Sequence, residues 1–254
     1  MKVVVIGFGK LGTCIAHILQ QSNGIQLVQV YNRSIKTTNP LGLASDVFTN
    51  QLAHIITDAD VYFITVTDTA IAEVAAQMPR VAGLVVHMSG ATPMEVLMPV
   101  SSSVGVLWPM KSIGIATRQI APNTICYQGN TEETTKRIAQ LAHLFTPQIL
   151  LTTQLQRQQY HMLAAVTSNF TNHLYALAQE YCQQHQLPFT TLQSLIEETA
   201  TRLATTDAKT SQTGPALRGD EKTIATHRQL LQQNAVLLNL YNACTSSIQL
   251  FHNG

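Results

Sequence analysis

Glycines near the start of the chain have the spacing of a phosphate-binding turn. The motif Gly7-Phe8-Gly9-Lys10-Leu11-Gly12 follows the apolar run Val3–Ile6 and opens an amphipathic helix. In such a motif the first glycine permits the tight turn, the second lets the backbone approach a pyrophosphate, and the third lets helix and strand pack closely. The helix N-terminus attracts the phosphates. The motif predicts a dinucleotide site, and the alternative is that its glycines only make a turn.

The choice of dinucleotide depends on the end of the second strand, ~20 residues past the motif, where an acid would hold the ribose 2′-OH of NAD. Asn32-Arg33-Ser34 stands there instead. Arg33 can pair bidentately with a 2′-phosphate, Ser34 adds a hydroxyl donor, and no carboxylate in this stretch repels the phosphate. The residues favour NADP as the cofactor, although Arg33 could instead lie on a solvated loop.

Other strand ends should also approach the ligand, because ligands of open α/β sheets bind at the carboxyl ends of the strands. Val66 and Thr67 follow one such strand and are expected beside the cofactor. Ser89 follows another, in His87-Met88-Ser89-Gly90, and is a candidate hydrogen-bond partner near the nicotinamide. His87 is interpreted as a structural histidine rather than a catalytic one.

A long helix is predicted from about Gln154 to Gln184. Its large apolar residues recur at spacings of three and four, which predicts one core-facing stripe, made of Leu163, Val166, Phe170, Leu174, Leu177 and Tyr181. The opposite face carries His161, Ala165, Ser168 and Asn172, with Asn169 beside them, and no Asp, Glu, Lys or Arg stands between Gln158 and Gln179. Solvent-facing helices normally carry charges, so this second face is expected to meet a cleft or another subunit.

His161 on that second face is a candidate for proton transfer, since histidine titrates close to neutral pH. Asn169 and Ser168 could fix a carbonyl or an imine. With Ser89, His161 and Asn169 form the predicted catalytic set; the alternative is that His161 packs at a domain or subunit interface. Arg218 could grip a substrate carboxylate or bind Asp220, which is placed to cap the next helix.

Short β-branched runs alternate with helical stretches up to about residue 152, which is typical of a parallel α/β sheet. Strands are predicted at Val3–Ile6, Leu27–Tyr31, Val61–Val66, Leu84–Met88, Gly105–Trp108, Thr124–Gln128 and Gln148–Leu151. From Thr153 onward only helices are predicted. The expected fold is therefore a doubly wound, mainly parallel sheet of the Rossmann type over residues 1–152, followed by an all-helical domain over 153–254.

The composition restricts the partners. The 254 residues are 45% hydrophobic and 11% charged, with a formal net charge of +1. Such a chain can bury a core but offers no basic stripe for nucleic acid and no segment for a membrane. The four cysteines are scattered and the start of the chain lacks the pattern of a signal peptide. We expect a cytoplasmic protein with a small-molecule substrate and no metal site.

Several motifs together resemble a known family. They are Gly7-Phe8-Gly9-Lys10-Leu11-Gly12, Val66-Thr67-Asp68-Thr69-Ala70-Ile71, His87-Met88-Ser89-Gly90, Thr167-Ser168-Asn169-Phe170 and Thr213-Gly214-Pro215-Ala216-Leu217-Arg218-Gly219-Asp220. In these the chain resembles NADP oxidoreductases that join a Rossmann-like N-terminal domain to a C-terminal domain of unknown function. The last motif is the most specific, because Rossmann proteins at large do not share it.

That family is similar to pyrroline-5-carboxylate reductase, ketopantoate reductase and enzymes related to 6-phosphogluconate dehydrogenase. The resemblance implies a helical second domain, a frequent dimer and an active site between domains. Two departures weaken the transfer of roles. Many relatives read His-Pro where this chain has Trp108-Pro109, and the lysine that hydroxyacid dehydrogenases carry one turn before Asn169 is replaced here by Ala165.

The predicted function is an NADP-dependent reductase or dehydrogenase that transfers a hydride between NADP(H) and a small carbonyl, imine or hydroxy compound at the interdomain cleft. We expect a homodimer formed through part of the long helix. The alternative is a noncatalytic module that senses NADP(H) or serves as a scaffold. The substrate itself is not predicted.

Overall fold

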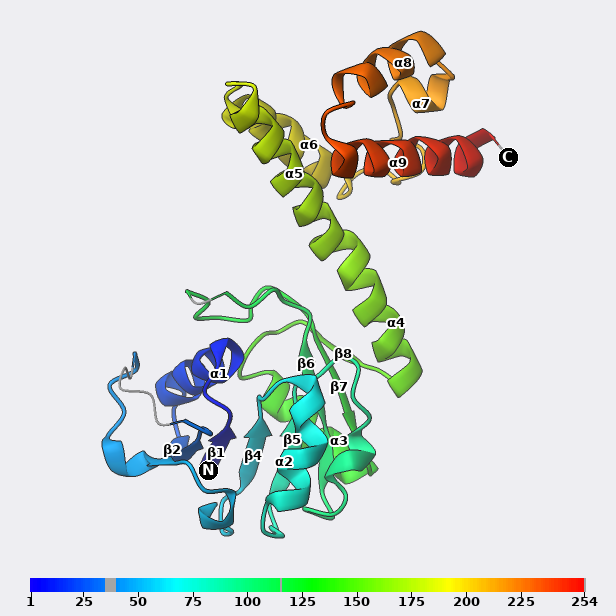
Figure 1. Cartoon of the computed structure of the whole chain (residues 1–254). Helices are drawn as coiled ribbons and strands as arrows, with labels where there is room; N and C mark the ends of the chain where they lie inside the picture. The colour runs from blue at the N-terminus through cyan, green and yellow to red at the C-terminus, as the bar shows by residue number, and fades with distance from the viewer. Residues whose placement is uncertain (35–39, 115, 254) are drawn as a thin grey trace. The chain divides into compact units, whose positions relative to one another are not determined.

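The computed structural model describes residues 1–34, 40–114 and 116–253. The chain forms two compact units, Met1–Asn169 and Phe170–Gly254. The first unit contains a mixed sheet and its covering helices (Figure 1). The last strand ends at Leu151, and from Gln154 onward the described elements are helices, whereas the boundary between the units lies further on, after Asn169.

Eight strands form one sheet in the order β3-β2-β1-β4-β5-β6-β7-β8. Their bounds are β1 Lys2–Ile6, β2 Gln26–Tyr31, β3 Phe48–Thr49, β4 Val61–Ile64, β5 Leu84–His87, β6 Val104–Pro109, β7 Ile125–Gly129 and β8 Ile149–Leu151. All neighbouring pairs are parallel except β6 and β7, which are antiparallel. The structure confirms the seven predicted strands and the predicted fold class; the two-residue strand β3 was missed.

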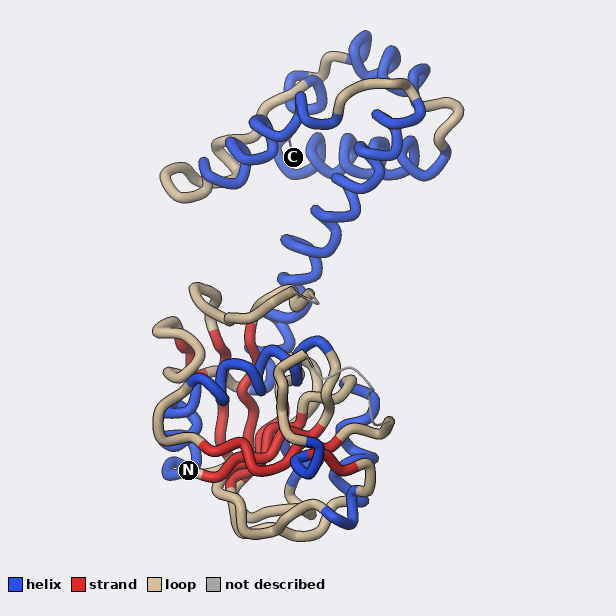
Figure 2. Tube along the Cα trace, turned by 90° about the vertical axis from the view of Figure 1, so that its left-hand side faces the viewer, coloured by secondary structure: helices blue, strands red, loops and turns tan. Residues whose placement is uncertain are grey.

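Continuous β-branched runs form the central strands because both faces of the sheet are covered. One face of the sheet packs with α1 (Lys10–Gln21) and α3 (Glu132–Ala142) in a buried cluster that includes Val3, Val5 and Ile138. The other face packs with α2 (Ile71–Gln77) and the 3-10 helix η4 (Met94–Leu97). Figure 2 shows the strands between these helices. The carboxyl ends of the parallel strands are thereby left for loops.

Three further 3-10 helices connect these elements: η1 (Ser45–Val47), η2 (Leu52–His54) and η3 (Asp68–Ala70). After β8 the chain enters a long helical segment made of α4 (Gln154–Ala164), a π-helical turn η5 (Ala165–Phe170) and α5 (Thr171–Gln184). A capping box between Thr153 and Gln156 starts α4. The segment has the predicted bounds, but its interior contains a π turn that helical periodicity did not predict.

The expectation that the large apolar stripe of this helix forms core is wrong for the single chain. Leu163 is 47% exposed, Val166 45%, Phe170 61% and Leu174 39%. Only Leu177, at 8%, is buried, while Tyr181 is half-buried. Periodicity identifies the residues that need a partner surface but not where that surface is. The π turn is a second reason why the periodicity misled, because it changes the spacing at which side chains share a face.

The second unit continues with η6 (Phe189–Leu192), α6 (Gln193–Arg202), α7 (Pro215–Arg218), α8 (Glu221–Leu230) and α9 (Ala235–Asn253). Asp220 caps α8 as predicted, since its carboxylate accepts hydrogen bonds from Thr223 N at 3.1 Å and Thr223 Oγ1 at 2.7 Å. The buried apolar residues of this unit are few and include Leu177, Ile224 and Leu231. The unit therefore has little core of its own.

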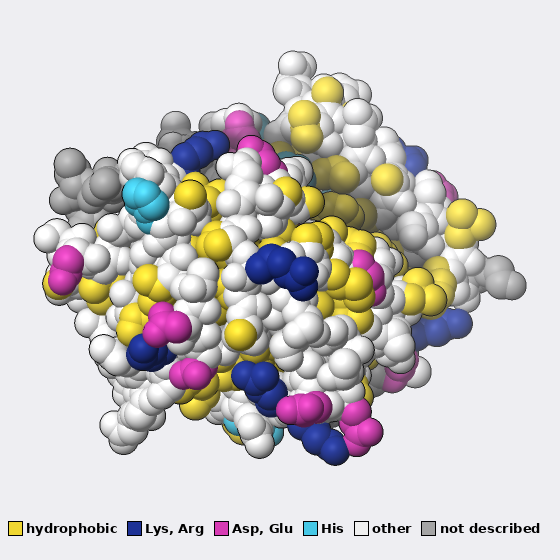
Figure 3. Space-filling view, turned by 90° about the horizontal axis from the view of Figure 1, so that it is seen from below, with side chains coloured by type: hydrophobic (Ala, Val, Ile, Leu, Met, Phe, Trp, Pro, Cys, Tyr) yellow, Lys and Arg dark blue, Asp and Glu magenta, His cyan; other side chains and the backbone are white. Residues whose placement is uncertain are grey.

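Figure 3 shows the molecule from below the view of Figure 1. This face carries charges of both signs among apolar side chains. Positive and negative side chains alternate there, and neither sign forms a continuous patch on that face. Within the described residues, no helix combines the length and the apolarity that crossing a membrane demands.

Candidate functional site

The Gly7–Gly12 turn has the geometry that its three glycines predict. Gly7 has a φ of 105°, a conformation that side chains rarely adopt. A Cβ on Gly12 would lie 1.9 Å from the carbonyl oxygen of Gly7, so this glycine permits the close packing of α1 on β1. A Cβ on Gly9, by contrast, would have no neighbour within 4 Å. The protein's own packing leaves this space open, as an approaching pyrophosphate requires.

A hollow elsewhere in the first unit has a volume of about 490 Å³. The hollow at the glycine turn, named here the dinucleotide hollow, is larger, with a volume of about 660 Å³. The predicted cofactor residues among its lining are Gly7, Phe8, Gly9, Lys10, Leu11, Asn32, Arg33, Val66 and Thr67. Gly12 lies beneath the turn and Ser34 is exposed outside this lining. No side chain caps the start of α1, which leaves its first N–H groups to a ligand. These residues fit a dinucleotide.

Asn32 and Arg33 have different surroundings at the end of β2. Asn32 Oδ1 accepts a hydrogen bond from Phe8 N at 3.1 Å, so this side chain ties the glycine turn to β2. Arg33 is exposed and lines the hollow. The sequence missed Glu73, which reaches the same hollow from α2 and accepts a hydrogen bond from Gln77 Nε2 at 3.3 Å. The Asn32–Ser34 stretch alone indicated a site free of carboxylates. The structure differs, because the Glu73 carboxylate lines the same hollow.

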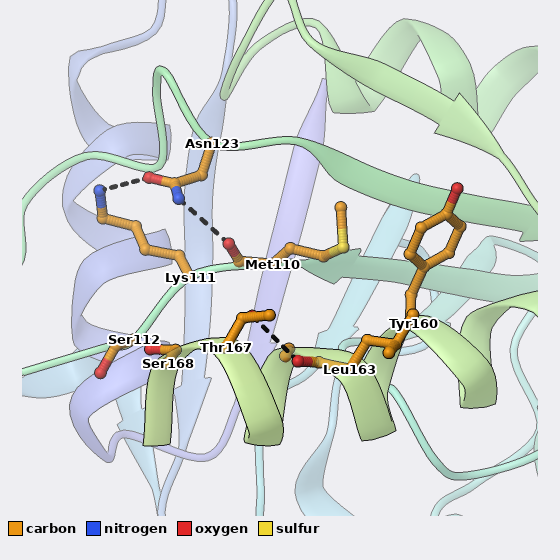
Figure 4. A pocket seen from close by; sticks show the side chains of 9 residues that line it. Met110, Lys111, Ser112, Asn123, Tyr160, Leu163, Thr167 and Ser168 are labelled. Atoms are coloured by element: carbon orange, nitrogen blue, oxygen red, sulfur yellow. Dashed lines mark hydrogen bonds between the residues drawn. The ribbon is translucent and has the colours of Figure 1, made fainter. Parts of the chain in front are cut away.

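A second depression lies between the chain that leaves β6 and helix α4, within the first unit. It has two adjoining parts of about 490 and 220 Å³, both lined by Met110, Lys111, Ser112, Ala164 and Ser168. His161 and Asn169 line the smaller part together with Trp108. In Figure 4, Lys111 points to Asn123, whose Oδ1 accepts a hydrogen bond from Lys111 Nζ at 3.0 Å. The structure thus brings His161, Ser168 and Asn169 to one hollow.

His161 packs against two residues at neighbouring strand ends. Its ring meets the Trp108 ring edge-on, with centroids 5.5 Å apart. A Cβ on Gly90 would lie 2.8 Å from Cδ2 of His161 and 2.7 Å from Cε2 of Trp108. Gly90 is needed here because two rings occupy the space of a side chain. The Trp108 ring therefore forms part of the surface on which the His161 imidazole rests.

Ser89 is 4% exposed and is not part of the lining of the His161 hollow. Its Oγ accepts hydrogen bonds from Ala91 N at 3.1 Å and Thr92 N at 3.0 Å, which closes a turn over residues 89–92. His87 Nδ1 accepts from Ser89 N at 3.2 Å. Ser89 therefore shapes the turn, and any contact with a nicotinamide remains a prediction.

Burial, with a smaller effect from the charge of Arg157, lowers the pKa of His87 to about 4. This imidazole is neutral at pH 7 and completely buried. Burial also raises the pKa of the Cys126 thiol to about 11, so this cysteine is not a nucleophile near neutral pH. These environments agree with the interpretation of His87 as structural.

Sequence reasoning missed Arg157, which is completely buried. Its Nη1 donates to Gln128 Oε1 at 2.7 Å and its Nη2 donates to the carbonyl oxygen of Thr92 at 3.0 Å. One signal could have identified it: Arg157 is the only Asp, Glu, Lys or Arg between Arg137 and Glu180. Arg218, the other arginine considered, is exposed at the end of α7 in the second unit.

Comparison with known proteins gives matches along nearly the whole chain. Residues 2–88 match the family model described as NADP oxidoreductase coenzyme F420-dependent, and residues 123–248 match a domain of unknown function, DUF2520. A search of curated proteins found no match. A "putative NADP oxidoreductase" from Bacteroides fragilis is 31% identical, with a TM-score of 0.86, over 98% of this chain and 97% of that one.

More distant structures share the fold. Pyrroline carboxylate reductase from Plasmodium falciparum is 12% identical, with a TM-score of 0.63, over 98% of this chain and 97% of that one. A reductive aminase from Aspergillus terreus is 17% identical, with a TM-score of 0.63, over 95% and 91%. The predicted resemblance is confirmed. With its glycine turn, its doubly wound sheet and its C-terminal helices, the chain belongs to the family of NADP oxidoreductases that join a Rossmann-like N-terminal domain to DUF2520.

Proposed function

We propose that this protein is an NADPH-dependent reductase of a small carbonyl or imine compound, or the dehydrogenase of the reverse reaction. The observation that carries the proposal is the position of the two hollows at one edge of the sheet. The dinucleotide hollow lies at the ends of β1, β2 and β4. His161 packs at the ends of β5 and β6, the next strands in the sheet. An extended dinucleotide follows such an edge.

The reaction requires a hydride and a proton, and the nicotinamide supplies the hydride when bound. His161 donates the proton to the oxygen of a carbonyl, or receives it in the reverse direction. The Asn169 amide and the Ser168 hydroxyl, which line the same depression, orient the polar atom of the substrate. An imine protonated before reduction needs no proton at nitrogen during hydride transfer, and His161 then orients it.

The substrate class is tested by mixing the purified protein with NADPH and a panel of keto acids, ketones and cyclic imines. The relatives guide this choice, since the Plasmodium reductase was solved with NADP bound and the Aspergillus aminase with cyclohexanone and allyl amine. We expect NADPH oxidation with at least one member of the panel. NADPH binding without turnover, together with a protein partner in pull-downs, would favour the alternative function of a noncatalytic NADP(H) sensor or scaffold.

We expect NADPH to bind more tightly than NADH and the Arg33→Ala variant to lose most of this difference. A charge-assisted bidentate contact with the 2′-phosphate contributes about 1.5 to 3 kcal/mol, or roughly 10- to 100-fold in affinity. Titration of both cofactors into both proteins measures the effect. Arg80→Ala is the control, because Arg80 is exposed and is not part of this hollow's lining. Equal affinities of the unmodified protein for the two cofactors would contradict the preference for NADP.

We further propose that a second copy of the chain covers the exposed apolar stripe of the long helix. Large side chains of this exposure are costly in water and suit an interface. We expect a dimer that resists dilution to micromolar concentration, as measured by light scattering. Leu174→Glu should dissociate it, whereas Gln179→Glu, an equal charge at an exposed position of the same helix, should not. A monomer throughout the dilution series would show that the stripe has no such partner.

A further inference from the structure

The surroundings of the Arg157 guanidinium are unusual for a charged group. The side chain is completely buried, and Nε has no hydrogen-bond partner. No ion pair joins it to an acid among the described residues. Burial lowers its pKa, and the electrostatic effects of Cys126 and, to a smaller degree, Glu95 only partly oppose this. A buried charge without an ion pair destabilises a fold. The contacts of Arg157 therefore need an explanation other than stability.

One of those contacts reaches the turn Ser89–Thr92, to which the neighbouring Gln158 also bonds. Arg157 Nη2 donates to the carbonyl oxygen of Thr92, and Gln158 Nε2 donates to that of Ala91 at 3.3 Å. On the other side of Thr92, its N–H donates to Ser89 Oγ. The turn is therefore held from within by Ser89 and from outside by the first turns of α4. Arg157 Nη1 extends this chain of hydrogen bonds to Gln128 on β7.

His161 lies four residues after Arg157, on the same face of α4. It packs on Gly90, in the middle of the turn that Arg157 holds. The hydrogen bond from Arg157 to Thr92 thus fixes the distance between the turn and α4. That distance in turn sets the position of His161 on Gly90. A shift of Thr92 moves Gly90 and with it the surface against which the imidazole rests.

We propose that Arg157 is a positioning residue: through Thr92 it fixes the turn Ser89–Thr92 against α4 and thereby holds His161 at the hollow. This inference rests on the proposed function of His161. It accounts for a completely buried guanidinium whose two terminal nitrogens both donate hydrogen bonds. The guanidinium matters because two donors in one plane hold two elements, β7 and the turn, at a fixed separation.

The first test is Arg157→Met, which leaves an unbranched apolar side chain, shorter than that of arginine, and removes all of its donors. We expect kcat to fall by about tenfold or more, while the NADPH affinity stays within about twofold and the melting temperature does not fall. Arg157→Lys, with a single cationic donor group, should restore part of kcat. Arg137→Met on α3 is the matched control and should leave kcat unchanged. An Arg157→Met protein with unchanged kcat would overturn the proposal.

A second measurement does not depend on turnover. The NMR signals of the amides of Ser89, Gly90 and Ala91 and of the His161 ring should shift or broaden in Arg157→Met, while those of Gly7 and Gly9 stay in place. If the wild-type protein reduces no compound of the panel, the proposed function fails, but these spectra still decide the role of Arg157. Unchanged signals in the turn would overturn it. If Arg157→Met does not fold, Arg157→Lys takes its place in both measurements, with unchanged kcat and unchanged turn signals again overturning the proposal.

Discussion

Gly90→Ala should lower turnover by about 10² while leaving NADPH affinity within about twofold. The added methyl group would lie 2.7 Å from Trp108 Cε2 and 2.8 Å from His161 Cδ2, closer than non-bonded carbons approach. Trp108 is buried at 8% exposure and has little room to move, whereas His161 lies on the exposed side of α4. The imidazole is therefore displaced. A shift of about 1 Å in a catalytic group costs on the order of 10² in rate.

Steady-state kinetics and cofactor titration on the same preparation measure this effect. Gly114→Ala is the matched control, because Gly114 also lies in a loop, and its nearest neighbour to an added Cβ is Thr117 Oγ1 at 3.7 Å. If Gly90 acts through His161, the double variant Gly90→Ala with His161→Gln should be no slower than the slower single variant. Additive losses, or full activity of Gly90→Ala, would show that the contact with His161 has no catalytic consequence.

The sequence was most informative where one residue type satisfies one local requirement. The glycine turn could be predicted because Gly7 needs a positive φ and Gly12 a close approach, and the structure has both. The seven longer strands could be predicted because runs such as Val3–Ile6 are buried on both faces of the sheet. The strand β3 has two residues, Phe48 and Thr49, too few for a pattern to form.

Contacts between distant segments were the part that could not be predicted. Arg157 stood out in its uncharged surroundings, but nothing local indicates that it bonds to Thr92, 65 residues earlier. The packing of His161 on Gly90 likewise depends on how α4 lies against the ends of β5 and β6. The direction of β7 was also hidden, since its residues Ile125–Gly129 look the same in a parallel or an antiparallel neighbour.

The long helix shows both what the sequence could predict and what it could not. Its charge-free stretch indicated that side chains meet something other than water, and His161, Ser168 and Asn169 do line one hollow. The prediction for the opposite stripe failed, because the single chain leaves Leu163 and Phe170 exposed. Amphipathic spacing reports which residues need burial. Whether the same chain or a second copy buries them depends on tertiary and quaternary contacts that spacing does not encode.

His161→Gln should lower turnover by about 10² or more, with NADPH affinity nearly unchanged. Glutamine keeps a hydrogen-bonding group of similar reach but cannot transfer a proton near neutral pH. His161 lines the hollow with Asn169 and does not line the dinucleotide hollow, so cofactor binding should not depend on it. Asn169→Ala should have an effect of similar size, because it removes the amide that we propose orients the substrate.

Stability separates this catalytic role from a packing role for the imidazole. His161 is exposed, and its edge-on contact with Trp108 contributes about 1 kcal/mol or less, so the melting temperature of His161→Gln should stay close to that of the wild type. His173→Gln, at an exposed position of α5, is the matched control and should change neither turnover nor stability. Turnover by stopped-flow absorbance and unfolding by calorimetry decide between the two roles. A His161→Gln protein that melts several degrees earlier and reduces its substrate at the wild-type rate would make His161 a structural residue, and the proton would have to come from another group or from water.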